Sequence, residues 1–197
     1  SGRGCPFNCT FCYRMHKGYR PRKIQRIVEE IEFLQDFYRI NYIDFADELL
    51  MVNSQRTIDI SEALEPLGIK WMCNGRLNHA KPEVLKAMKK SGCVFINYGI
   101  ESVDDNVLKL MNKQLTYEQI EAGVKYTLEA GISPGLNILW GNIGDNIDTL
   151  QRSVEFLRKY DDHTQMRTIR PVTPYPCCDL YYKAIEDGKL KGIEDFY

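Results

Sequence analysis

Short apolar segments alternate with longer amphipathic segments along the whole chain, and this alternation limits the possible folds more than any other feature of the sequence. Apolar residues at spacings of three and four predict helices, among them 23–38, 55–66, 116–130 and 147–159. Strands and helices in alternation are typical of a parallel sheet with right-handed crossovers. The sequence therefore predicts an α/β fold that binds its ligands at the carboxyl ends of the strands.

The short apolar runs between the helices predict the strands of this sheet. They lie at 42–45, 69–73, 94–98, 133–140 and, more weakly, 166–170, with a stub before Cys5. Thr116 and Gln119 form a capping box, and Asp179 is placed to cap a last helix. Counting the stub, there are about six strand-helix units, fewer than the eight of a closed barrel. We therefore expect an open, partial (β/α)6 TIM-like barrel.

Composition excludes several classes of protein. The 197 residues fit one domain that buries a core without disulfides. With 26 basic and 27 acidic side chains, no overall charge draws the chain to nucleic acid or to an anionic membrane. No apolar run reaches the roughly 20 residues of a membrane-spanning helix. These features predict a cytoplasmic protein with no membrane span and no clear nucleic-acid signal.

Three of the seven cysteines lie close together near the start of the chain, with the spacing C-x3-C-x2-C: Cys5, Cys9 and Cys12. Thiolates suit iron-sulfur clusters, and a 4Fe-4S cluster usually takes four of them. Three ligands leave one iron open, as a catalytic metal site requires. The alternative is a zinc-stabilised binding module with His16 as fourth ligand, but the position of the loop at the edge of a long α/β chain favours the cluster.

This loop, with Phe11 directly before its last cysteine, resembles the signature of the radical S-adenosylmethionine (SAM) superfamily. The resemblance covers nearly the whole chain. It implies a 4Fe-4S cluster held by the three cysteines, with SAM chelated to the open iron through its amino and carboxylate groups. Reductive cleavage of SAM would give a 5′-deoxyadenosyl radical that abstracts hydrogen from a substrate. A degenerate, noncatalytic scaffold is a third alternative.

The same resemblance implies cofactor contacts after the first two full strands. Ala46, Asp47 and Glu48 stand where the family contacts the methionyl amino group of SAM, although acidic residues there also suit a helix cap. Arg76 is similar to an arginine that related enzymes direct towards the cofactor carboxylate. The alternative for Arg76 is a surface arginine paired with a neighbouring acid.

Further contacts are implied after the next two strands. Glu101 belongs to a G-I-E-S stretch that resembles the element meeting the cofactor ribose, whereas Ser102 is expected to be the N-cap of the next helix. Asn137 and Gly141 belong to a strand and turn that resemble the lining of the adenine pocket. That turn matches the family pattern only loosely, so Gly141 is open to a purely conformational role.

Residues 174–181 resemble a stretch of cobalamin-associated radical enzymes, except that Cys177 and Cys178 replace a glycine and a threonine. A structural role for this pair is favoured over one in the substrate cavity. Cys73 and Cys93 are expected to be inert and buried. The overall likeness is to the branch that includes methyltransferases and oxidative ring cyclases, and a methylthiotransferase-type enzyme is the alternative.

We expect residues 1–197 to be a radical SAM catalytic core that is truncated at both ends, with the N-terminal cobalamin-binding domain absent. The isolated chain is then expected to lack methyl transfer, and whether the full-length protein uses cobalamin stays open. The resemblance also implies a small-molecule substrate and an electron donor such as flavodoxin or ferredoxin. The sequence identifies neither the substrate nor the residue that acts on it.

Overall fold

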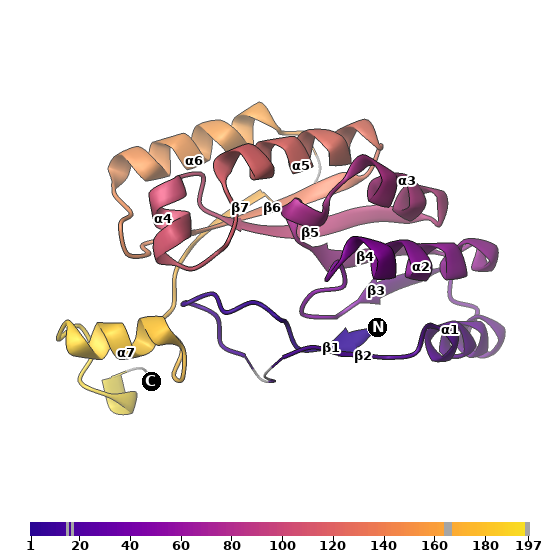
Figure 1. Ribbon diagram of the computed structural model, residues 1–197, viewed down its shortest axis with the longest axis horizontal. Helices are drawn as coiled ribbons and strands as arrows, with labels where there is room; N and C mark the ends of the chain where they lie inside the picture. The colour runs from indigo at the N-terminus through magenta and orange to yellow at the C-terminus, as the bar shows by residue number, and fades with distance from the viewer. Residues whose placement is uncertain (15, 17, 164–166, 196–197) are drawn as a thin grey trace.

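The computed structural model describes residues 1–14, 16, 18–163 and 167–195, and within them five parallel strands form the main sheet (Figure 1). The strands follow one another in chain order: β3 (Tyr42–Phe45), β4 (Lys70–Gly75), β5 (Cys93–Glu101), β6 (Ser133–Trp140) and β7 (Arg167–Pro171). A second, two-stranded antiparallel sheet joins β1 (Gly2–Arg3) to β2 (Arg20–Pro21). The predicted α/β class is therefore confirmed.

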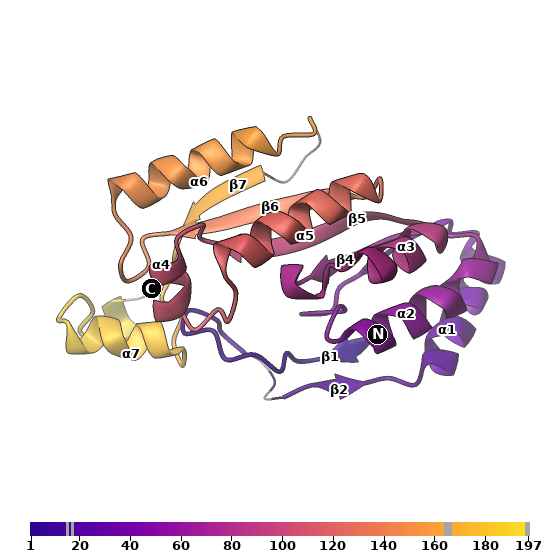
Figure 2. The same ribbon diagram turned by 45° about the horizontal axis from the view of Figure 1, so that its top comes forward.

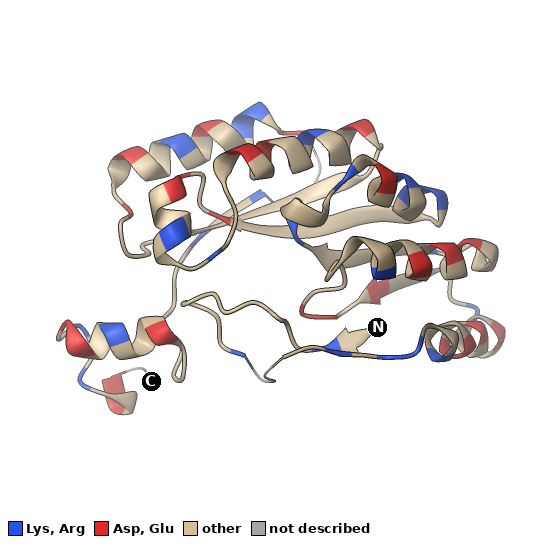
Figure 3. Cartoon of the chain, viewed as in Figure 1, with Lys and Arg blue, Asp and Glu red and all other residues tan. Residues whose placement is uncertain are grey.

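Helices follow the strands, and all but the last one, α7, cover one face of the sheet (Figure 2). They are α1 (Ile24–Tyr38), α2 (Ser54–Leu64), α3 (Pro82–Lys90), α4 (Asp105–Leu110), α5 (Tyr117–Glu129), α6 (Ile147–Lys159) and α7 (Asp179–Glu186). Short 3-10 turns lie at Glu65–Leu67, Leu77–His79 and Ile193–Asp195. Acidic and basic side chains alternate along the outer helices, without a large region of one sign (Figure 3).

The structure differs from the sequence predictions at three local points. The stub before Cys5 is not part of the main sheet, because the chain turns back through the cysteine loop and Arg20–Pro21 pairs with it. The N-cap of α4 is Asp104, whose side chain accepts from the Val107 N–H, and Ser102 is therefore not the cap. Asp179 begins α7 without capping it. The predicted strand at 166–170 is seen from residue 167, since residue 166 lies outside the described residues.

The core fills the space between the sheet and its helices. Trp71 on β4 is fully buried, and its indole N–H donates to the Ser91 carbonyl oxygen at 3.0 Å. Tyr98 on β5 is also fully buried, and its hydroxyl lies 3.1 Å from Thr127 Oγ1 on α5. Each polar tip therefore has a partner, so these large side chains bury their apolar area without leaving a donor unsatisfied.

Two expectations about individual side chains agree with this core. Cys73 and Cys93 are both fully buried. The capping box of Thr116 and Gln119 opens α5 as the sequence predicts.

Among the described residues, no helix has the length and apolar character needed to cross a membrane. Because the strands are parallel, the residues that follow their carboxyl ends meet at one edge of the sheet, and the candidate site lies there.

Gly92, between α3 and β5, is expected to be among the glycines of the fold that are most sensitive to substitution. Its φ is +96°, and a Cβ at this position would collide with the backbone carbonyl oxygen of Ile69. We expect Gly92→Ala to lower the free energy of unfolding by about 3 kcal/mol, from backbone strain plus overpacking. Gly68→Ala is the matched control, because Gly68 has φ +64° but open space around it, and about 1 kcal/mol is expected. Urea denaturation measures both, and equal losses would contradict the steric argument.

Candidate functional site

A cavity of about 460 Å³ lies at the carboxyl edge of the sheet, under the cysteine loop. Every strand of the main sheet or the loop after it contributes to its wall. The lining residues are Cys5, Phe7, Cys9, Phe11, Cys12, Tyr13, Glu48, Leu49, Asn74, Gly75, Arg76, Asn97, Gly99, Glu101, Lys113, Asn137, Ile138, Leu139, Thr168 and Arg170. Most of the predicted site residues are therefore gathered in one place.

The cysteine loop contributes all three of its thiols to this cavity, and each cysteine is partly buried. Phe7 and Phe11 pack against the hydrophobic core and so hold the loop in place, while all three cysteines of the loop line the cavity. Among the described residues, no three His, Cys, Asp or Glu side chains are gathered closely enough to hold a single metal ion. The loop thus supplies thiols to a shared cavity without the compact geometry of a mononuclear site.

The protonation of these thiols reflects their surroundings. Burial is the main cause that raises the pKa of Cys12 to about 11, and the neighbouring Cys9 and Cys5 raise it further. Burial also raises the pKa of Cys5. A thiol must lose its proton to bind iron, so metal binding here releases protons. The donor set itself fits an iron-sulfur cluster, because three soft ligands line one cavity.

Arg76, directly after β4, is a buried cation to which the described part of the chain offers no anionic partner. It is 5% exposed, and its guanidinium carbon lies 3.8 Å from the centroid of the Phe7 ring. Its Nη2 donates to the Gln114 carbonyl oxygen at 3.3 Å, whereas its buried Nε has no hydrogen-bond partner. Burial is the main cause that lowers its pKa. A buried arginine of this kind at a cavity wall suits an anionic ligand such as a carboxylate.

Glu101 ends β5 and forms a buried ion pair with Lys113. Lys113 Nζ lies 3.0 Å from Glu101 Oε1, and the two side chains are 8% and 11% exposed. The same ammonium lies 5.7 Å from the centroid of the Phe11 ring in the cysteine loop. Glu101 has a φ of +69°, a strained value for a residue with a side chain. The strained backbone and the ion pair together fix the carboxylate at the cavity wall.

Polar side chains on four adjacent strands form a continuous ladder along the cavity. Thr168 Oγ1 donates to Asn137 Oδ1 at 2.7 Å, and Asn137 Nδ2 donates to Asn97 Oδ1 at 2.6 Å. Asn97 Nδ2 donates to Asn74 Oδ1 at 3.0 Å, and Asn74 Nδ2 donates to the Asp47 carbonyl oxygen at 2.8 Å. The predicted residue Asn137 is thus one member of a larger network, hereafter the amide ladder.

Sequence reasoning assigned no role to Lys113, Asn74, Asn97 or Thr168. A signal for Lys113 was available, because it lies between two buried apolar residues of a short turn, Met111 and Leu115. The asparagines were also visible as polar residues inside otherwise apolar strands. Their meaning depends on the alignment of neighbouring strands, which the sequence alone does not show.

Three of the predicted cofactor contacts do not line the cavity: Ala46, Asp47 and Gly141. The carboxylate of Asp47 is held by the Ser1 amino group at 2.5 Å, whereas Glu48 does reach the cavity. The Gly141 N–H donates to Asp145 Oδ2 at 3.0 Å and so belongs to a closed turn. The proposed roles of these three residues stay predictions.

The C-terminal cysteines lie outside the cavity lining. Cys177 is exposed, and Cys178 is buried at the start of α7. The Leu180 N–H, in the first turn of α7, donates to the Thr10 carbonyl oxygen at 2.9 Å. This segment therefore contacts the cysteine loop through its backbone, and Figure 1 shows α7 beside the loop.

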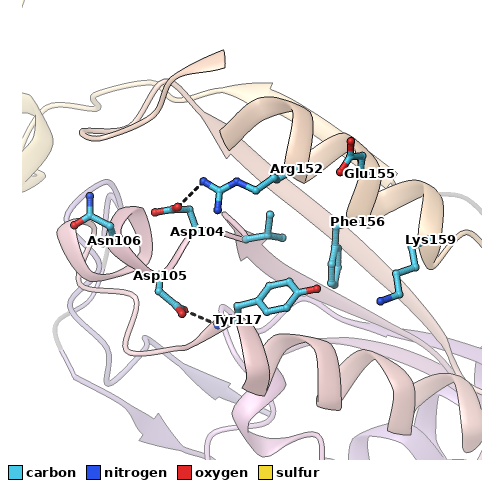
Figure 4. A pocket seen from close by; sticks show the side chains of 9 residues that line it. Asp104, Asp105, Asn106, Tyr117, Arg152, Glu155, Phe156 and Lys159 are labelled. Carbon is cyan, nitrogen blue, oxygen red and sulfur yellow. Dashed lines mark hydrogen bonds and ion pairs between the residues drawn. The ribbon is translucent and has the colours of Figure 1, made fainter. Parts of the chain in front are cut away.

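A second cavity, of about 500 Å³, lies among α4, α5 and α6 (Figure 4). Four of its five charged side chains, those of Asp104, Asp105, Arg152 and Lys159, have partners within the protein. Arg152 Nη2 lies 2.6 Å from Asp104 Oδ2, and Asp105 Oδ1 accepts from the Tyr117 N–H at 2.7 Å. Lys159 Nζ pairs with Glu121 at 2.8 Å. Both cations of this cavity, Arg152 and Lys159, are therefore already paired with carboxylates, unlike Arg76 in the first cavity.

Thiols, a buried cation and a polar ladder at the carboxyl edge of a parallel sheet define a cofactor-binding α/β enzyme core. A sequence profile of the Radical SAM superfamily matches residues 1–157. The chain belongs to the radical SAM superfamily, and the predicted class of enzyme, with a 4Fe-4S cluster and SAM as its cofactors, is confirmed.

Several known proteins resemble the chain over most of its length. An uncharacterized methyltransferase of Pyrococcus horikoshii is 33% identical over 195 residues, which cover 96% of this chain and 42% of that protein. The anaerobic magnesium-protoporphyrin IX monomethyl ester cyclase of Rubrivivax gelatinosus is 28% identical over 200 residues, 98% of this chain and 36% of that protein. This chain thus spans less than half the length of these relatives.

Solved structures support the fold. The radical S-adenosylmethionine methyltransferase TsrM from Kitasatospora setae, determined with cobalamin and a 4Fe-4S cluster bound, has a TM-score of 0.83 at 17% identity. The match covers 93% of this chain and 35% of TsrM. At this identity the likeness concerns the fold, and it confirms the predicted partial barrel.

The ion pair of Lys113 and Glu101 is expected to stabilise the protein more than an exposed pair does. Lys113→Met leaves the Glu101 carboxylate without its partner, so we expect the free energy of unfolding to fall by about 3 kcal/mol. Lys125→Met is the control, because Lys125 pairs with Glu121 at 3.4 Å and is 51% exposed. A loss below about 1 kcal/mol is expected there. Urea denaturation of the metal-free protein compares them, and similar losses would show that the buried pair is not special.

Proposed function

We propose that this chain is the radical-generating core of an enzyme that acts on a small-molecule substrate. The observation that carries the proposal is the convergence of the Cys5, Cys9 and Cys12 thiols with Arg76, whose buried Nε has no hydrogen-bond partner among the described residues, in one cavity. When bound, the cluster delivers one electron to SAM and so supplies methionine and a 5′-deoxyadenosyl radical for hydrogen abstraction. The protein's part is to hold these groups in position and to keep water from them.

Each side chain has a task that its surroundings support. Cys5, Cys9 and Cys12 hold three irons and leave the fourth open. Arg76 suits the methionyl carboxylate of SAM, because it is buried and its Nε lacks a partner. Glu101, fixed by Lys113, accepts hydrogen bonds from the ribose hydroxyls.

The remaining contacts of the proposal follow the same edge of the sheet. Glu48 suits the methionyl ammonium, with Ala46 and Asp47 as its neighbours in the same loop. Asn137 lies along the cavity on β6 and suits the adenine, with Gly141 in the turn that follows. Phe11 packs between the loop and the core and holds the last cysteine ligand in place.

The reaction that we favour is methylation or oxidative cyclisation. It is supported by the similarity of the chain to a methyltransferase and a cyclase, and by the TsrM structure with bound cobalamin. We propose that the chain is the catalytic core of a longer protein that also binds cobalamin. An electron donor such as flavodoxin or ferredoxin and a cytoplasmic location complete the proposal.

Cluster binding and SAM cleavage test this function directly. After anaerobic reconstitution with iron and sulfide, we expect a brown protein that releases 5′-deoxyadenosine and methionine from SAM when dithionite supplies electrons. Cys9→Ala should lose both properties, because it removes one ligand. Cys177→Ala, at an exposed cysteine outside the cavity, should keep both.

Other outcomes would identify the alternatives. A colourless protein that contains zinc would indicate a binding module and refute the proposed chemistry. A brown protein that leaves SAM intact under strong reductant would indicate a noncatalytic scaffold.

Arg76 is expected to set the affinity for SAM. Arg76→Lys keeps the charge but loses the planar, bidentate donors and the stacking on Phe7. We expect SAM to bind about tenfold more weakly, which corresponds to about 1.4 kcal/mol, as measured by calorimetry on the reconstituted protein. Arg152→Lys, in the second cavity, should leave the affinity unchanged. Equal affinities for the Arg76→Lys variant and the unmodified protein would remove Arg76 from the proposed cofactor site.

A further inference from the structure

The turn between α4 and α5 has an unusual backbone. Its residues 111–114, hereafter the 111–114 turn, include two non-glycine residues with positive φ, Asn112 at 51° and Gln114 at 53°. Asparagine adopts this left-handed conformation more readily than most residues, but glutamine does not. Residues other than glycine keep such a conformation where surrounding contacts hold them. The backbone N–H groups of Met111, Asn112 and Lys113 donate to carbonyl oxygens of α4, and the other contacts of the turn lead to the cysteine loop and its cavity.

The first two residues of the turn hold the backbone of the cysteine loop. The Thr10 N–H donates to the Met111 carbonyl oxygen at 3.0 Å. The Asn112 side-chain amide donates to the Asn8 carbonyl oxygen at 2.8 Å. Asn8 and Thr10 flank Cys9, so these two bonds fix the backbone on both sides of the central cysteine.

The next two residues hold the charged wall of the cavity. Lys113 Nζ lies 3.0 Å from Glu101 Oε1 and 5.7 Å from the centroid of the Phe11 ring. The Gln114 carbonyl oxygen accepts from Arg76 Nη2 at 3.3 Å. Four successive residues thus contribute one contact each to the cysteine loop or to the side chains that face it.

We propose that the 111–114 turn is the positioning element of the cluster site, with Asn112 as the residue that sets the path of the loop around Cys9. This proposal rests on the proposed function, since it assumes that the cysteine loop holds the cluster. The loop is short and only partly buried, and hydrogen bonds to Asn8 and Thr10 limit the backbone freedom that cluster binding would otherwise have to remove. A loop held in place before the cluster binds releases the cluster more slowly.

The opposite side of the loop is held as well. The Thr10 carbonyl oxygen accepts from the Leu180 N–H at 2.9 Å, so both backbone polar groups of Thr10 are paired, one with the 111–114 turn and one with α7. Because α7 holds only Thr10 whereas the turn holds Asn8 and Thr10, the turn is the more extensive of the two contacts. The side chain that distinguishes it is Asn112.

The test separates the amide donor of Asn112 from its backbone conformation. Asn112→Gly keeps the left-handed conformation and loses only the donor, whereas Asn112→Asp keeps the side-chain shape and replaces the donating nitrogen by oxygen. We expect both variants to lose the reconstituted cluster to a chelator about five times faster than the unmodified protein. One hydrogen bond of about 1 kcal/mol corresponds to this ratio. The measurement is the decay of the cluster absorption, with iron and sulfide content and the EPR spectrum of the reduced cluster as further readouts.

Arg39→Gly is the matched control, because Arg39 also has a positive φ, at 56°, but lies at the end of α1 away from the cavity. Its decay rate should equal that of the unmodified protein. Unchanged decay in Asn112→Gly and Asn112→Asp would overturn the proposal while leaving the cluster itself established. If the unmodified protein takes up no cluster, the proposed function fails first and this inference fails with it. Thermal melting of the metal-free variants shows whether each one is folded. If Asn112→Gly does not fold, the cluster decay rate of Asn112→Asp alone tests the role of the amide donor.

Discussion

The whole site depends on one geometric constraint, namely that the carboxyl ends of parallel strands lie along one edge of a sheet. Glu101 and Arg76 are 25 positions apart in the chain, yet β4 and β5 are adjacent, so both side chains reach the same cavity. The cysteine loop closes over this edge because Phe7 and Phe11 pack into the core beneath it. Without the parallel register the thiols would face solvent rather than a polar cavity.

The amide ladder shows how the same register gives the cavity a defined polarity. Its direction is fixed at both ends by chemistry, since Asn74 donates to the Asp47 carbonyl oxygen and Asn137 donates to the Tyr98 carbonyl oxygen. Both of these partners are carbonyl oxygens, so the side-chain nitrogen must face them, and no single asparagine of the ladder can exchange the positions of its amide nitrogen and oxygen. The Asn137 side-chain nitrogen donates two hydrogen bonds, and the Thr168 hydroxyl donates one. The donors at the β6 and β7 end of the ladder are therefore used, and the side-chain oxygens there keep lone pairs that can accept further hydrogen bonds. The floor of the cavity is therefore asymmetric.

The sequence predicts the parts of this site that are encoded locally. The three cysteines are recognisable because their spacing lies within one loop, and Arg76 and Glu101 because each directly follows or ends a predictable strand. The contribution of Lys113 could not be read in this way, since its partner Glu101 lies twelve positions earlier and meets it only after α4 has formed. The cap of α4 was misassigned for a local reason: Ser102 does accept a backbone hydrogen bond, from Asp104, but Asp104 is the residue that caps the helix.

Electrostatics connects two cations of the cavity, Arg76 and Lys113, to the cysteines. Burial dominates in raising the pKa of Cys5 and of Cys12, and it opposes the thiolate form that iron requires. Arg76 acts against burial at Cys5, and Lys113 acts against it at Cys12. Each cation therefore has two effects. It makes its contact at the cavity wall, and it lowers the free energy needed to ionise a nearby cysteine thiol, Cys5 for Arg76 and Cys12 for Lys113. Positive charge close to the sulfurs therefore favours an anionic cluster, whereas the low solvent access of the cavity opposes ionisation of the thiols.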